Sequence, residues 1–268
     1  MFAADPRVLT RIAPTIRRVV IADPNLASAR LLVDIMKSLG AREVVTECDE
    51  ARVLDAIRQI EPGLVFTERM GPMLDGEHLT RKLRRSNLAS RRCPVIMVTA
   101  DATASSIKGA RDCGVHEFLR KPFTSSDLFR RVENVALKPR EWVEGVSYVG
   151  PDRRRFNSGE YAGPQKRKVD KPASAASAAV AVKDQAMRIL AAALDQFDSD
   201  PLQAVRAART QAETLKALAI RTSDPKLAIA ASSLEAFLAS STPTKALLGV
   251  PINALLILAD PQPLARAS

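Results

Sequence analysis

The sequence predicts an α/β fold in the first half of the chain, a doubly wound five-stranded parallel sheet, followed by a flexible linker and a small all-α region. Three observations predict this arrangement. Between residues 15 and 138, short apolar runs alternate five times with amphipathic stretches, as in βα units around a parallel sheet. Residues 139–179 are rich in Gly, Pro, Ser, Lys and Arg. Residues 180–260 are rich in Ala and Leu at helical spacing.

The elements of the first half follow one another in strict alternation. Gly40 and Gly114 close two of the amphipathic stretches, as glycine does just beyond a helix. Five consecutive βα units of this length are typical of a flavodoxin-like sheet, whose ligands bind where the strands end. We expect strands at 19–22, 43–46, 64–67, 95–98 and 117–120, and helices at 26–39, 51–60, 78–85, 102–113 and 125–137.

Polar residues stand at four of the expected strand ends. Asp23 follows the first strand and is itself followed by Pro24. Glu68 follows the third strand, Thr99 the fourth and Lys121 the fifth. Because the carboxyl ends of parallel strands lie at one edge of a sheet, we expect these side chains to form one pocket.

The turn after the third strand carries a recognisable motif. Pro72 and Asp75-Gly76 stand at the spacing of a Met-Pro-x-x-Asp-Gly turn, from which Gly71 departs at the Met position. Lys121-Pro122 follows the fifth strand. In these features the sequence resembles the receiver domains of bacterial two-component response regulators. The resemblance covers nearly half of the chain.

The resemblance implies roles for individual residues. Glu68 takes the position of the phosphoacceptor Asp, Thr99 and Phe118 match the two switch positions, and Asp23 matches the first of two metal-binding acids. Pro24 replaces the second acid. Since proline has no side-chain oxygen, we do not expect Mg²⁺ to bind. Outside this pocket the sequence has no Gly-rich phosphate loop, HExxH motif or nucleophile elbow, so we expect no other cofactor and no enzymatic activity.

The altered pocket leaves two interpretations open. Phosphoryl transfer in this family needs a carboxylate nucleophile, an oxygen-liganded Mg²⁺ and a nearby cation, and only the cation, Lys121, is clearly kept. In the first interpretation, Glu68 pairs with Lys121 and Thr99 and holds the domain in an active-like state without phosphate. Alternatively, Asp23, Glu68 and Lys121 satisfy one another as a structural ion cluster.

The linker concentrates the positive charge of the chain. The segment 138–171, which includes most of the linker, has nine basic and five acidic side chains, within a chain whose formal net charge is +10. Such clusters bind the phosphates of a cyclic dinucleotide or RNA, or an acidic protein surface, or serve as a solvated tether. The candidate anion-binding residues are Arg153, Arg154, Arg155, Lys166, Arg167 and Lys168.

The tail predicts a helical bundle for docking or dimerisation. Asp200-Pro201 and Asp224-Pro225 read as an N-cap followed by a proline in the first turn. The only histidines are His78 and His116, so the tail is not a histidine phosphotransfer bundle, and its near-neutral charge disfavours DNA binding. We expect tail helices at 180–198, 201–221, 225–240 and 250–259.

Together these patterns predict an N-terminal arm (1–14), a receiver-like domain (15–138), a basic linker (139–179), a helical region (180–260) and a terminal tail (261–268). The hypothesis is a signalling adaptor that acts by protein–protein interaction, with a histidine kinase among its partners and a homodimer formed through the tail. The alternatives are a phosphorylated response regulator and a cyclic-dinucleotide or nucleic-acid effector. No apolar run is long enough to span a membrane and no secretory signal is evident, so we expect a cytoplasmic protein.

Overall fold

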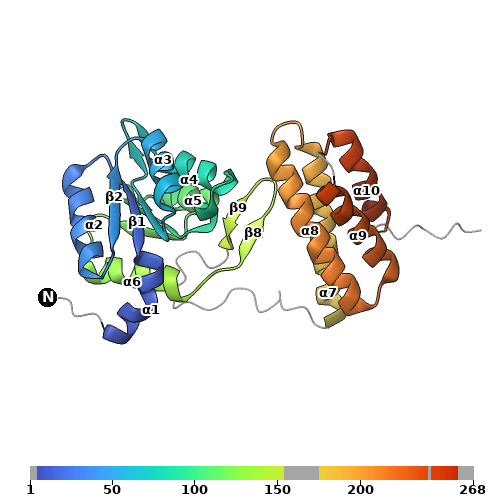
Figure 1. The fold of residues 1–268 in the computed structure, drawn as a ribbon, viewed down its shortest axis with the longest axis horizontal. Coiled ribbons are helices and arrows are strands. Elements are labelled where there is room, and N and C mark those ends of the chain that lie inside the picture. The colour runs from blue at the N-terminus through green and yellow to red at the C-terminus, as the bar shows by residue number, and fades with distance from the viewer. Residues whose placement is uncertain (1–4, 154–174, 241–242, 259–268) are drawn as a thin grey trace, which may run out of the picture. The chain divides into compact units, whose positions relative to one another are not determined.

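The computed structural model describes residues 5–153, 175–240 and 243–258 (Figure 1). The described residues fall into two compact units. The first holds the chain up to Val143 together with residues 148–153. The second holds residues 144–147 and the described chain from Ala175 onward.

A five-stranded parallel sheet forms the centre of the first unit, with strand order β2-β1-β3-β6-β7, which confirms the predicted fold class. The reversal of strand order beside β1 is the feature that creates a crevice at the carboxyl ends of the strands. Three of the strands, β1, β3 and β6, are almost entirely buried, as expected of apolar runs covered on both faces. The strands are β1 (Arg18–Ala22), β2 (Glu43–Glu47), β3 (Leu64–Thr67), β6 (Val95–Thr99) and β7 (Glu117–Arg120).

Helices cover both faces of this sheet and enclose two separate hydrophobic cores. Val20 and Val65 face the core shared with α3, α4 and α5, while Ile21 and Phe66 face the core shared with α2 and α6. A small β4–β5 pair stands in the turn after β3. The bounds are α2 (Leu26–Ser38), α3 (Glu50–Ile60), β4 (Met70–Gly71), β5 (Leu74–Asp75), α4 (Gly76–Arg85), the 3-10 helix η1 (Ala89–Arg92), α5 (Ala104–Cys113) and α6 (Ser125–Leu137).

The segment predicted as an N-terminal arm forms a helix, α1 (Pro6–Ile16), that belongs to the first unit. Asp5 caps it by accepting a hydrogen bond from the Arg7 amide, 2.8 Å away. Ile12 and Ile16 are fully buried and extend the core beneath β1, and α1 packs against α6. The boundary at residue 14 was therefore wrong, because the apolar face of α1 completes the core.

The first part of the predicted linker is also ordered, as a hairpin of β8 (Trp142–Glu144) and β9 (Val149–Pro151). The Tyr148 hydroxyl donates to the Pro151 carbonyl at 2.6 Å, and Tyr148 is buried. Gly150 approaches Gly114 so closely that an added Cβ would lie 2.8 Å from the Gly114 Cα. Residues 140–143 and 148–153 are thus part of the first unit and no tether.

A fully buried arginine, Arg84 at the end of α4, joins this hairpin to the rest of the unit. Its guanidinium donates to the carbonyls of Gly114, Arg91 and Cys93 over distances of 2.8–3.0 Å. The same group lies 5.4 Å from the centroid of the Trp142 ring. Backbone carbonyls and an aromatic face therefore satisfy this cation in the core.

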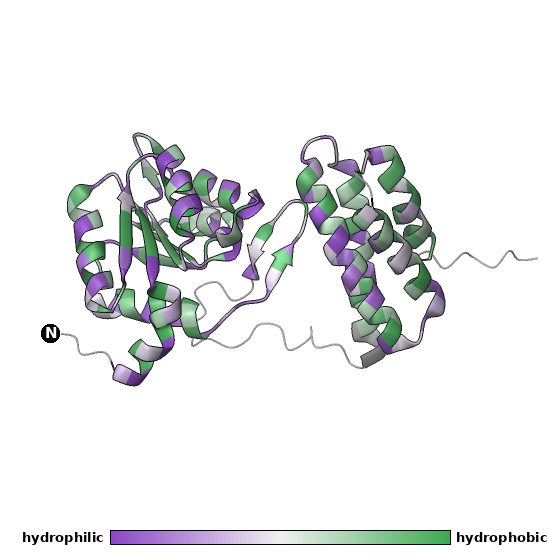
Figure 2. Cartoon of the chain, in the orientation of Figure 1, coloured by the Kyte–Doolittle hydropathy of each residue, from purple (hydrophilic) through white to green (hydrophobic). Residues whose placement is uncertain are grey.

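The second unit is a bundle of four described helices, which pack in chain order with α10 closing against α7. Hydrophobic residues run along each helix (Figure 2), and Leu190, Leu215, Leu234 and Leu248 belong to one buried cluster. The last helix begins earlier than the predicted residue 250, because Thr244 caps it and Pro251 lies inside it. The bounds are α7 (Ala175–Asp195), α8 (Pro201–Thr222), α9 (Pro225–Ser240) and α10 (Lys245–Ile257).

Within the described ranges, none of the helices combines the length and the apolar character required to cross a membrane.

Candidate functional site

Four polar side chains meet at the carboxyl edge of the sheet because each follows or ends a strand. Asp23 comes directly after β1, Glu68 after β3 and Lys121 after β7, while Thr99 is the last residue of β6. Backbone bonds extend the sheet into this edge: the Glu68 amide donates to the Ala22 carbonyl at 2.7 Å, and the Lys121 amide donates to the Thr99 carbonyl at 2.8 Å. The sheet therefore fixes where these side chains begin.

Lys121 joins the two carboxylates of the pocket. Its Nζ lies 2.8 Å from Asp23 Oδ2 and 2.7 Å from Glu68 Oε2. The second oxygen of each carboxylate accepts from a backbone amide, Asp23 Oδ1 from Asn25 and Glu68 Oε1 from Arg69, at 2.9 and 2.8 Å. Glu68 thus makes the expected contact with Lys121, and every carboxylate oxygen has a partner.

The electrostatics of the pocket favour the charged form of the lysine. Burial by itself lowers the pKa of Lys121, but hydrogen bonds from its ammonium group to Asp23 and Glu68 outweigh that effect and raise the pKa above its ordinary value. The Asp23 side chain is only 2% exposed, so this ion pair is shielded from solvent. The arrangement carries two negative charges and one positive charge.

Neither of the two switch positions forms a hydrogen bond with Glu68 in the described chain. The Thr99 hydroxyl accepts from the Asp101 amide at 3.3 Å, and the partners of Glu68 among the described residues are the Arg69 amide and Lys121, so the expected Thr99–Glu68 pair does not form. Phe118 is buried in the core beside α5, opposite Met97 of β6. Thr99 is held by its own loop and Phe118 by packing.

The donor set of the pocket does not fit Mg²⁺, the metal that receiver domains bind. Pro24 offers no side-chain oxygen and lies against Gly71, where an added Cβ would be 2.5 Å from the Pro24 Cγ. The remaining carboxylates, Asp23 and Glu68, share the Lys121 ammonium. Across the described ranges, no group of three or more His, Cys, Asp and Glu side chains is arranged to hold a metal ion.

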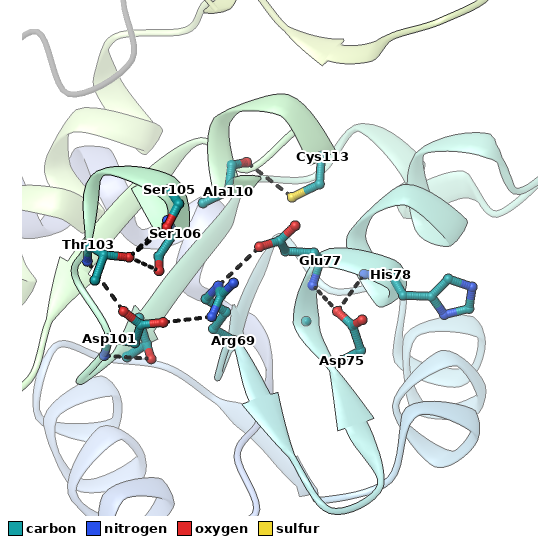
Figure 3. Close-up of polar contacts among 12 residues, drawn as sticks. Arg69, Asp75, Glu77, His78, Asp101, Thr103, Ser105, Ser106, Ala110 and Cys113 are labelled. Carbon is teal, nitrogen blue, oxygen red and sulfur yellow. Dashed lines mark hydrogen bonds and ion pairs between the residues drawn. The ribbon is translucent and has the colours of Figure 1, made fainter. Parts of the chain in front are cut away.

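Arg69 forms a network beside the pocket that the sequence analysis did not find (Figure 3). Its Nε lies 3.1 Å from Glu77 Oε1 in α4, and its Nη1 lies 2.7 Å from Asp101 Oδ2 in the loop after β6. Arg69 therefore ties the phosphoacceptor-equivalent turn to α4 and to the Thr99 loop. Its partners are 8 and 32 residues away in the sequence, so no local motif marks them.

Of the candidate anion-binding residues in the linker, Arg153 lies within the described chain. Its Nη1 pairs with Asp112 Oδ1 at 3.2 Å, and its guanidinium lies 4.4 Å from the centroid of the Tyr148 ring. These contacts attach Arg153 to the first unit. Arg154, Arg155, Lys166, Arg167 and Lys168 lie outside the described residues.

A doubly wound sheet with an acid, a hydroxyl and a lysine at its carboxyl edge defines a receiver-type domain. The chain belongs to the response regulator receiver family. The model of this family, described as "Response regulator receiver domain", matches residues 19–133. It is 30% identical to Protein PilG of Pseudomonas aeruginosa over 117 residues, which are 43% of this chain and 84% of PilG.

A longer relative matches over a similar length of this chain. The DNA-binding response regulator MtrA of Mycobacterium tuberculosis is 27% identical over 116 residues, 43% of this chain and 49% of MtrA. The chain thus spans about half the length of the MtrA proteins that it matches. Among solved structures, the receiver domain of the sensor histidine kinase PA1611 from P. aeruginosa is 24% identical, with 44% of this chain and 95% of that chain covered and a TM-score of 0.41.

Proposed function

We propose that this protein is a non-enzymatic signalling adaptor whose receiver domain acts in two-component signalling by protein–protein interaction and without phosphorylation of Glu68. The observation that carries the proposal is the double ion pair of Lys121 with Asp23 and Glu68. In this pocket Glu68 is already paired with Lys121, the cation that would stabilise a phosphoryl group.

Charge and geometry both oppose phosphorylation. Both oxygens of Glu68 already accept a hydrogen bond, Oε2 from Lys121 and Oε1 from the Arg69 amide, and either would have to approach an anionic phosphate donor. The pocket carries a net negative charge, and Pro24 stands where a second acid would help to hold a divalent cation. Without that cation, the like charges of the carboxylates and the phosphate repel each other.

Exposed apolar side chains of the helical unit support an interaction role, and we propose that they take part in dimerisation. Ile220, Ile229, Val250 and Ile257 are each at least 67% exposed, although the helices that carry them have a well-packed core. Large exposed apolar side chains are common at protein-binding surfaces. We expect the full chain to form dimers that Ile220→Asp and Ile229→Asp together weaken, measured by sedimentation velocity. Monomers at all concentrations would remove dimerisation from the proposal.

The decisive experiment is incubation of the full chain with acetyl phosphate and Mg²⁺, followed by intact-mass analysis. We expect no phosphate adduct on the parent protein. A variant with Glu68→Asp and Pro24→Asp restores the missing groups and serves as the positive control, and circular dichroism checks its fold.

An adduct on the parent that Glu68→Gln abolishes would overturn the proposal and support a phosphorylated response regulator in a histidine kinase phosphorelay. An adduct on the restored variant alone would support the adaptor. If neither protein is modified by acetyl phosphate, transfer from a phosphorylated histidine kinase replaces it as the donor, with the same criterion.

A further inference from the structure

The amino-terminal edge of the sheet, opposite the Glu68 pocket, contains a cavity of about 600 Å³. Arg17 and Arg18 enter it from the start of β1 and Arg42 from the start of β2, while Glu61 and Gly63 form the wall before β3. A second, shallow depression shares Arg18, Glu61 and Gly63 and continues to Arg92. Because the cavity and the depression share these lining residues, we refer to them together as the groove along this edge.

Three of the arginines are available to a ligand. Arg17, Arg18 and Arg42 are exposed, and their guanidinium groups make no hydrogen bond or ion pair with any residue in the described ranges. The acids of the groove, Glu43 and Glu61, are exposed as well and leave all three arginines uncompensated by direct contact. An unpaired cluster of guanidinium groups attracts anions.

The backbone beneath these side chains is fixed. The Arg17 carbonyl accepts from the amides of Arg42 and Glu43, both at 3.1 Å, and the Arg18 carbonyl accepts from the Gly63 amide at 2.9 Å. Gly63 lies so close to the Thr15 carbonyl that a side chain there would collide with the backbone. Helix α1, anchored by its buried isoleucines, therefore holds its end against the sheet and positions Arg17.

The chemistry of the groove selects a small phosphorylated ligand. The guanidinium fork binds phosphate oxygens in pairs, and three arginines, Arg17, Arg18 and Arg42, line the same cavity, which suits a chain of two or more phosphoryl groups. Glu43 and Glu61 are hydrogen-bond acceptors for hydroxyl groups on such a ligand. The volume is that of a small-molecule site.

We propose that the groove between α1 and the amino-terminal edge of the sheet is a binding site for a small polyphosphate, either a nucleoside triphosphate or an inorganic polyphosphate, held by Arg17, Arg18 and Arg42. This site is separate from the Glu68 pocket and does not depend on the adaptor function.

The test is isothermal titration of the full chain with ATP, inorganic tripolyphosphate and orthophosphate at low salt. The cavity variant carries Arg17→Gln and Arg42→Gln. The matched control carries Arg30→Gln and Arg52→Gln, which remove the same charge from exposed positions on α2 and α3. We expect saturable binding of a polyphosphate that the cavity variant weakens by at least about tenfold and the control by less than about twofold.

Tighter binding of ATP than of tripolyphosphate would identify a nucleotide, and the reverse an inorganic ligand. Absence of saturable binding would overturn the proposal, as would equal weakening by the two variants, which would indicate general charge attraction. A third variant, with the linker clusters 153–155 and 166–168 neutralised, detects binding through the linker, and loss in that variant alone would also refute the groove.

Discussion

Two glycines provide a matched test of whether strand β9 packs closely on the turn after α5 within the first unit. Gly40 and Gly114 each follow a helix in a left-handed conformation, with φ of 101° and 97°. A Cβ added at Gly40 meets nothing within 4 Å, whereas one added at Gly114 would lie 2.8 Å from the Val149 carbonyl oxygen in β9. Gly40→Ala therefore measures backbone strain alone, and Gly114→Ala measures strain plus displacement of the hairpin.

The magnitudes follow from these geometries. A left-handed alanine costs roughly 1–2 kcal/mol, which is the expected loss for Gly40→Ala. Overpacking against a backbone atom adds about 1–3 kcal/mol, so Gly114→Ala should lower the free energy of unfolding by that much more. The side chain of Arg84, 3.2 Å from the added Cβ, is fully buried and gives little room for relief.

Urea unfolding followed by tryptophan fluorescence measures this difference. Trp142, the sole tryptophan, stands in β8, so its signal reports the first unit even though the chain has two units. We expect Gly114→Ala to have the lower midpoint and an altered native spectrum. Equal losses of stability for the two substitutions would refute close packing of the hairpin on this turn.

Three further predictions concern charged groups. Because the pKa of Lys121 is raised, its ion pairs stabilise the fold at pH values below 10.5, the ordinary lysine pKa, and this stabilisation is lost as the pH rises through the folded-state pKa. In unfolding measured as a function of pH, Lys121→Met should reduce the loss of stability at alkaline pH. Burial, and then the guanidinium groups of Arg84 and Arg140, lower the pKa of His116 well below 6.5. The stability of the fold should therefore fall as the pH drops below about 6.5. The amide oxygen of a glutamine at this position can accept from the Val95 amide, as the histidine does. His116→Gln should therefore reduce the fall in melting temperature at acid pH. Arg69→Gln should lower the free energy of unfolding in urea by about 1 kcal/mol at low salt and by less at high salt, since its partners Glu77 and Asp101 are partly exposed. An equal loss of stability at high salt would contradict an electrostatic role for Arg69.

The sheet was predictable because its strands are short apolar runs placed between helical patterns. Strand β3 matches the expected residues 64–67, and β1 and β6 are each one residue longer than expected. The pocket was predictable for the same reason, since each of its side chains stands at a strand end. The contact of Lys121 with Glu68 follows from that placement.

The missed elements had weaker or misread signals. Helix α1 begins with Asp5-Pro6, the same cap and proline pair that correctly marked Asp200-Pro201, but Pro14 and two arginines obscured its apolar face. The hairpin strands have three residues each, too few for a periodic pattern, and they lie in a charged, Gly- and Pro-containing segment. Long-range partners such as Asp101 for Arg69 depend on the tertiary fold.

The buried guanidinium of Arg84 also sets an order of events during synthesis. The residues of α4 leave the ribosome long before Trp142 and Tyr148, which close the shell around that cation. A nascent chain that has just released α6 can pair all five sheet strands, yet the Arg84 side still lacks its cover. The domain therefore reaches its final packing only after residue 151 has emerged, well beyond the last helix of the receiver.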